Sequence, residues 1–163
     1  LERTARQSQG HQLEQWKEGG DAVFPLAPLP SKKVVRPDAW FVYRMDSQVL
    51  VGLVEVDRGT ERGTRRWQEK LRAYTTLFQG GRLKEQTGYH KARVLVTVPN
   101  ERRRQALTRF LSEQGGRSIV EMFWLTTAQT LDAPGFTASV WQQPGSALLK
   151  PLIPALSAGE RMP

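Results

Sequence analysis

Three acidic side chains and one lysine follow each other in an order that could bind a divalent cation and a phosphate. They are Asp38, Glu55, Asp57 and Lys70. Carboxylate oxygens are the ligands that a hard cation such as Mg²⁺ prefers. A bound cation polarises a phosphate and activates a water molecule, and a lysine ammonium stabilises the negative charge that develops on phosphate oxygens. These residue types therefore fit a metal-dependent phosphodiesterase, provided that the fold brings them together.

Two predicted strands would carry the acids. Residues 33–43 are rich in β-branched and aromatic side chains, and residues 48–57 are almost continuously apolar, which is typical of a strand covered on both faces. Residues 45–47 fit a short hairpin turn between them. Because side chains alternate along a strand, Glu55 and Asp57 share a face. Buried acids are costly unless they are paired or bind a metal, so both metal binding and pairing with arginines stay open.

A predicted helix over residues 61–78 would carry the lysine. Its apolar residues Trp67, Leu71 and Tyr74 recur at helical spacing, which indicates one buried face. Lys70 borders this face, so its ammonium could point back over the end of the sheet. A lysine that only extends its ammonium to water would occupy the same position.

Three segments carry a resemblance to a known family. They are Arg-Pro-Asp-Ala at 36–39, Glu-Val-Asp-Arg-Gly-Thr-Glu at 55–61 and Lys-Leu-Arg-Ala-Tyr at 70–74. Over about residues 10–125 the chain resembles the PD-(D/E)xK restriction-endonuclease-like nuclease superfamily, and within it the replication-relaxation family of plasmid and mobile-element proteins. The resemblance implies that Asp38 and Glu55 bind Mg²⁺ or Mn²⁺. Asp57 stands where the superfamily usually has a lysine, and the resemblance implies that Lys70 takes that role.

The resemblance and the predicted elements together give an expected fold and function. We expect an α/β fold with a central mixed β-sheet of four or five strands flanked by helices, over residues 1–131. The Pro/Gly-rich residues 132–163 would form a loosely packed tail. The implied function is a metal-dependent DNA endonuclease or nickase-like protein of plasmid or mobile-element replication. The alternative is a non-catalytic DNA-binding replication protein that retains the fold; Asp57 favours this alternative and Lys70 favours the enzyme.

The charge of the chain agrees with a nucleic-acid partner. Its formal net charge is +8, and residues 58–104 contain 13 Lys and Arg against 4 acids. A concentrated basic segment is what binding to a phosphate backbone requires, although a solubilising surface, RNA or anionic lipid would fit the same charge. The candidate DNA-binding residues are Arg58, Arg62, Arg65, Arg66, Arg72, Arg102, Arg103 and Arg104.

Composition and length limit the remaining options. The 163 residues are enough for one sizeable core. Cysteine is absent, which excludes disulfides and thiolate zinc sites. The sequence has no run of 18 apolar residues, so no membrane span is predicted. We expect a cytoplasmic protein that binds DNA and no membrane. A homodimer stays open, as does an upstream DNA-binding domain, since the chain begins with leucine and we expect it to be a fragment.

Other elements have weaker signals. Residues 11–17, 92–98 and 118–125 are predicted strands, and Asn100 fits the start of a helix. Glu18 is the better candidate for a further carboxylate ligand from an early element.

Overall fold

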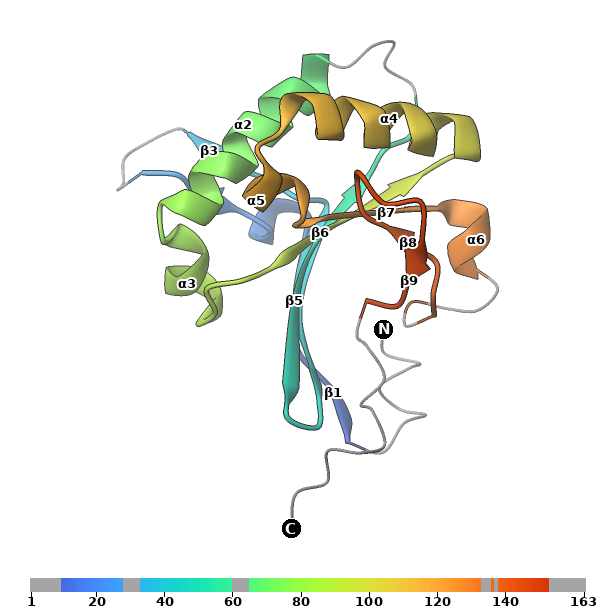
Figure 1. The fold of residues 1–163 in the computed structure, drawn as a ribbon. Coiled ribbons are helices and arrows are strands. Elements are labelled where there is room, and N and C mark those ends of the chain that lie inside the picture. The colour runs from blue at the N-terminus through green and yellow to red at the C-terminus, as the bar shows by residue number, and fades with distance from the viewer. Residues whose placement is uncertain (1–9, 28–32, 60–64, 133–135, 137, 153–163) are drawn as a thin grey trace.

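A mixed β-sheet lies at the centre of this computed structural model, which describes residues 10–27, 33–59, 65–132, 136 and 138–152 (Figure 1). In the described part the sheet has seven strands, in the order β1-β4-β5-β6-β7-β8-β9. Their bounds are β1 (His11–Glu18), β4 (Ala39–Met45), β5 (Gln48–Val56), β6 (Arg93–Val98), β7 (Phe123–Thr127), β8 (Trp141–Gln142) and β9 (Leu149–Lys150). The expected α/β fold with a mixed central sheet is confirmed, with more strands than expected.

The direction of the strands changes at β5. It pairs antiparallel with β4 through the expected hairpin and parallel with β6 on its other side. The apolar run of β5 is explained by this central position, since both of its faces are covered. Gly52 lies opposite Phe41, and a Cβ there would clash with the Phe41 ring. The glycine therefore lets an aromatic side chain cross the strand.

Helices cover one face of the sheet, which we call the helical face. Two crossovers build it, because parallel neighbours cannot be joined by tight turns. In Figure 1 the long helices of the two crossovers lie over the same side of the sheet. Their apolar residues, including Trp67, Leu71, Leu107 and Leu111, pack on Leu53 and the valines of β6. The helices are α2 (Arg65–Gln79), α3 (Arg82–Thr87), α4 (Glu101–Gln114) and α5 (Arg117–Val120).

A small second sheet packs against the same helical layer. It consists of β2 (Phe24–Pro25) and β3 (Val34–Val35), and it follows the short 3₁₀ helix η1 (Gly19–Asp21). Phe24 and Val35 are buried in the core of the helical face. β3 contacts α2, so the small sheet lies beside this helix on the helical face.

Residues near the C-terminus cover the opposite face, which we call the C-terminal face. The short helix α6 (Ala128–Asp132) contributes Leu131 to it. Val140, Trp141 and Leu152 are buried there against Phe41, Leu95 and Trp124. β8 also pairs with β7. Residues 138–152 thus pack as part of the sheet and not as the loose tail expected from their composition.

Two predicted strands differ from the structure. The run at 33–43 is divided into β3 and β4, because Pro37 lacks the N–H that a continuous ladder needs. The run at 118–125 begins in the helix α5 and becomes a strand only at Phe123. Its apolar residues Ile119 and Val120 are buried all the same, so the run marks the core but not the conformation.

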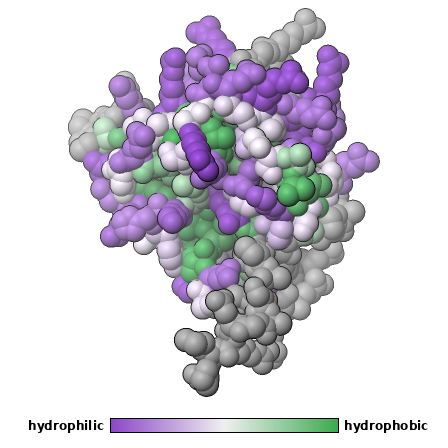
Figure 2. All heavy atoms as spheres, viewed as in Figure 1, coloured by the Kyte–Doolittle hydropathy of each residue, from purple (hydrophilic) through white to green (hydrophobic). Residues whose placement is uncertain are grey.

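Figure 2 shows hydrophilic side chains gathered around α2 and α4, with apolar ones visible between and below them. Among the described residues, no helix has both the length and the apolar character needed to cross a bilayer.

Candidate active site

Asp38 and Glu55 lie side by side at one end of the β4–β5 hairpin. The pairing of Ala39 with Val54 brings them to the same level of the two strands. Trp40 and Leu53 pair on the helical face, and alternation puts Asp38 and Glu55 on that face as well. The Asp38 carboxylate is exposed and accepts a hydrogen bond of 2.7 Å from the backbone N–H of Val56.

The Glu55 carboxylate is held by two side chains of α2. Glu55 is 1% exposed. Oε1 accepts a hydrogen bond of 2.8 Å from the hydroxyl of Tyr74, and Oε2 forms an ion pair with the ammonium of Lys70. Lys70 and Tyr74 are four residues apart, so they project from the same side of the helix. The Lys70 ammonium therefore points back over the end of the sheet and contacts Glu55 there.

The surroundings of Glu55 have opposing effects on its pKa. Burial raises the pKa of Glu55, the Lys70 charge and the Tyr74 hydroxyl lower it in part, and the nearby negative charge of Asp38 raises it again. The net result is a pKa above the ordinary value of 4.5. Burial, then the charge of Glu55, raises the pKa of Tyr74 well above 10.0, so this phenol stays a hydrogen-bond donor.

A pocket with a volume of about 260 Å³ opens beside this carboxylate, between β3 and α2. Glu55, Lys70 and Tyr74 line it together with Arg36 and Arg66. The Lys70 ammonium also lies 5.2 Å from the centre of the Trp67 ring, which favours a cation. The pocket thus places two carboxylates, the buried Glu55 and the exposed Glu69, and several cationic groups around one small space.

Asp57 does not line this pocket. Its Oδ2 accepts a hydrogen bond of 2.9 Å from the Trp67 indole and forms an ion pair of 2.8 Å with Arg103. Its Oδ1 accepts a hydrogen bond from the N–H of Gly59. Its side chain is 9% exposed. Burial alone would raise the pKa of Asp57, but these donors together lower it. Asp57 therefore connects β5 to α2 and α4.

The candidate DNA-binding arginines fall into two groups. Arg103 is engaged by Asp57, and Arg104, with a side chain only 14% exposed, pairs with Glu101. Both arginines are therefore held in ion pairs rather than extended into solvent. The Arg103–Asp57 pair could not be predicted from local sequence. Arg62 lies outside the described residues. Arg65 is 93% exposed and forms a long ion pair of 3.7 Å with Glu69. The other exposed members are Arg58, Arg66, Arg72 and Arg102.

Glu18 does not join the two carboxylates. It pairs with Ala39 on β4, and its side chain accepts a hydrogen bond from Trp16, whose ring stacks on Phe41. Phe41 belongs to the C-terminal face, so Glu18 lies on the wrong side of the sheet. Within the described residues, no group of three or more His, Cys, Asp or Glu side chains could hold a metal ion.

Comparison with known proteins gives one family. No curated protein matches the chain, and no solved structure matches it. Residues 1–92, more than half of the chain, match the model of the replication-relaxation family. Asp38, Glu55, Lys70 and Tyr74 all lie within the matched part. The chain belongs to the replication-relaxation family.

Proposed function

We propose that this chain is a metal-dependent DNA phosphodiesterase, an endonuclease or nickase of the PD-(D/E)xK type. The family suggests a role in the replication or relaxation of plasmids or mobile elements. One observation carries the finer proposal: Asp38 and Glu55 are adjacent on the helical face, and Lys70 contacts Glu55 from α2. Neighbouring carboxylates can hold a cation that activates a phosphodiester for hydrolysis, and a lysine beside them can stabilise the negative charge that develops.

The donor set fits Mg²⁺ or Mn²⁺. Mg²⁺ is commonly bound by one or two carboxylates and completes its shell with water and substrate phosphate, so two acids are enough. Asp38 and Glu55 would hold the ion, and the ion would supply Lewis-acid activation of the phosphate. The raised pKa of Glu55 means that protons compete with a cation for this carboxylate up to a higher pH than for an ordinary glutamate.

Lys70 and Tyr74 would have separate tasks. The Tyr74 hydroxyl fixes the Glu55 carboxylate from inside the core. The Lys70 ammonium is partly accessible and lines the pocket. If Glu55 held a cation, the Lys70 ammonium would be available to stabilise the negative charge on the phosphate.

A nicking assay tests the proposal. Supercoiled plasmid is incubated with the chain and Mg²⁺ or Mn²⁺, and the open-circular product is measured. Asp38→Asn and Glu55→Gln should abolish metal-dependent nicking because each removes one anionic ligand. Glu113→Gln, an exposed acid of α4, is the matched control and should retain activity. Mn²⁺ binding measured by electron paramagnetic resonance should be lost in the same two variants.

The alternative is a non-catalytic DNA-binding replication protein. It is favoured by Asp57, which occupies the usual lysine position and is fully engaged by Trp67 and Arg103. Under this alternative the wild-type chain binds DNA in electrophoretic mobility shifts but does not nick it with either metal. Binding would then be equal in the wild type, Asp38→Asn and Glu55→Gln.

A further inference from the structure

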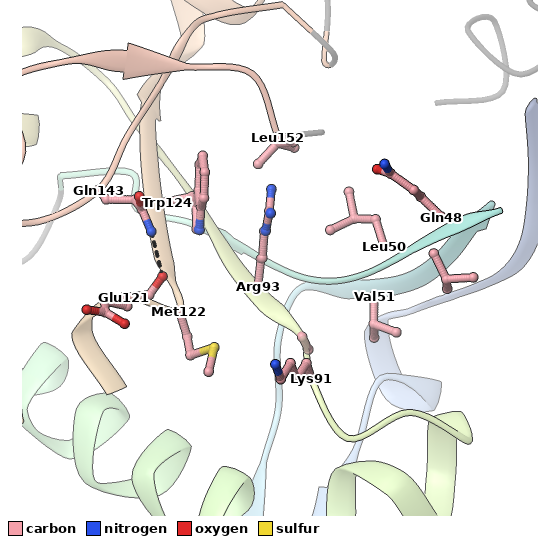
Figure 3. A pocket seen from close by; sticks show the side chains of 12 residues that line it. Gln48, Leu50, Val51, Lys91, Arg93, Glu121, Met122, Trp124, Gln143 and Leu152 are labelled. Carbon is pink, nitrogen blue, oxygen red and sulfur yellow. Dashed lines mark hydrogen bonds between the residues drawn. The ribbon is translucent and has the colours of Figure 1, made fainter. Parts of the chain in front are cut away.

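Arg93 is a half-buried cation with one buried donor that is unsatisfied. It is the first residue of the central strand β6 and faces the C-terminal face, opposite to the candidate active site. Its guanidinium carbon lies 4.2 Å from the centre of the Trp124 ring. Its Nη1 is buried and has no hydrogen-bond partner in the described part of the chain. Figure 3 shows the guanidinium rising between Trp124 and Leu152.

Such an arrangement is costly by itself. Burial lowers the pKa of Arg93, but a guanidinium stays charged at every ordinary pH. The Trp124 ring stabilises the cation through its face. The indole offers no acceptor atom to the guanidinium N–H groups, because its own nitrogen is only a donor. A buried donor without an acceptor destabilises the folded protein. A ligand that supplied an acceptor to Nη1 would therefore stabilise it.

A pocket surrounds this guanidinium. Its volume is about 390 Å³, within the range of pockets that bind small molecules. Apolar walls come from Leu50, Val51, Met122, Trp124 and Leu152, and Gln48 and Lys91 add polar groups (Figure 3).

Glu121, the one carboxylate among the described residues of the lining, does not neutralise Arg93. The Glu121 side chain forms an ion pair of 3.1 Å with Arg117. In Figure 3 its carboxylate points away from Arg93. The Gln143 amide is also engaged, since it donates to the Glu121 carbonyl and accepts from Lys150. The pocket therefore keeps a net positive character with apolar walls.

We propose that this pocket binds a small organic anion, with a carboxylate or phosphate group on Arg93 and an apolar body against Leu50, Met122 and Leu152. An oxyanion supplies the acceptors that Nη1 lacks, and the fork of a guanidinium suits two oxygens at once. Lys91, exposed at the pocket, adds a second positive charge. This site is on the other side of the sheet from Glu55, so it does not depend on the proposed nuclease activity.

Nuclear magnetic resonance titration of the whole chain tests the proposal. The probes are benzoate, phenyl phosphate and the neutral analogue benzamide, and the readout is the indole N–H signal of Trp124. At least one of the two anions should bind saturably, and about tenfold more tightly than benzamide, because a hydrogen bond to a charged group contributes this much. Inorganic phosphate should bind more weakly than phenyl phosphate, since it cannot use the apolar walls.

Variants decide the role of Arg93. Arg93→Met keeps an apolar side chain on Trp124 and should weaken anion binding by about tenfold or more. Arg93→Lys keeps the charge but not the fork and serves if the methionine variant does not fold; it should weaken binding several-fold. Arg109→Met, an exposed site on α4, should change nothing. The proposal fails if neither anion binds, if benzamide or inorganic phosphate binds as well as the organic anions, or if both Arg93 variants bind like wild type.

Discussion

At the scale of single residues, Glu55 combines burial with two opposing neighbours. Lys70 and Tyr74 stabilise its charged form, while burial and the charge of Asp38 favour the protonated form. Burial prevails, so the folded protein holds the Glu55 proton to a higher pH than the unfolded chain does. The ionised carboxylate is consequently a cost in folding that a cation at Asp38 and Glu55 would offset.

We therefore predict that stability falls as pH rises from about 4.5 through the raised pKa of Glu55. The sign follows because the folded state binds more protons in this window, and stability falls with pH wherever it does. Glu55→Gln should remove the fall. Lys70→Met should move it to higher pH, since it deletes the charge that lowers this pKa. Urea unfolding at a series of pH values measures it, and a wild-type curve that stays flat above pH 4.5 would contradict the prediction.

At the scale of elements, Asp57 connects four of them. It follows β5, its N–H donates to Thr97 of β6, and its carboxylate accepts from Trp67 of α2 and Arg103 of α4. The indole of Trp67 also lies beside Lys70. Through this arrangement Asp57 fixes where α2 lies, and α2 carries both side chains that hold Glu55.

We predict that Asp57→Ala lowers the free energy of unfolding by about 3–5 kcal/mol, because it leaves a largely buried arginine without its partner. Glu101→Ala removes the more exposed pair on the same helix and should cost about 0–1 kcal/mol. Both values come from urea unfolding. Equal losses in the two variants would mean that Asp57 is only one surface charge among others.

The C-terminal segment is the second element-scale case. Trp141 is buried, and its indole donates a hydrogen bond of 2.9 Å to the Phe136 carbonyl. Trp141→Ala should lower the free energy of unfolding by about 3–5 kcal/mol, as truncations of buried tryptophan do. Leu148→Ala, at a side chain 69% exposed, is the control and should leave stability unchanged. A small loss of stability in Trp141→Ala would contradict this prediction and favour the loosely packed tail that the composition predicts.

The elements that position the site follow from local patterns. The continuous apolar run predicts β5, helical spacing of Trp67, Leu71 and Tyr74 predicts α2, and Asn100 caps α4 by accepting the N–H of Arg103. These features depend on neighbours in sequence, so the sequence alone reveals them. The catalytic roles of Asp38, Glu55 and Lys70 stay predictions.

Partners far apart in sequence could not be predicted. Asp57 and Arg103 are 46 residues apart, and Arg93 meets Trp124 only because β6 and β7 pair in one register. A short strand at residues 138–141 could be predicted, but the composition does not show that Trp141 packs against Phe41 and Trp124. Such contacts depend on how strands align in space, and no local propensity encodes that alignment.

At the scale of the whole molecule, positive charge is concentrated in the helical layer. Among the exposed arginines of α2 and α4 are Arg65, Arg72 and Arg102. Arg103 and Arg104 of the same layer are used in ion pairs. The proposed DNA interface is therefore smaller than the number of basic residues in the sequence suggests.

We predict sequence-tolerant DNA binding that weakens steeply with salt, because each neutralised phosphate releases condensed counterions. Arg72→Gln and Arg102→Gln should each reduce the slope of log affinity against log salt by about 1. Arg104→Gln, at a half-buried arginine that already pairs with Glu101, should reduce it less. Fluorescence anisotropy at several salt concentrations measures the slopes. Affinity that does not vary with salt would exclude the phosphate backbone as the main contact.

The strand order leaves β5 incomplete while the chain emerges from the ribosome. β1, β4 and β5 are antiparallel neighbours that can pair as soon as they are synthesised, but the second edge of β5 waits for β6, which follows α2 and α3. During this interval α2 can cover one face of β5 but not its edge. An unpaired apolar strand edge readily pairs with another chain. Nascent chains that pause between α2 and β6 should therefore be the most prone to aggregate and the most dependent on chaperones.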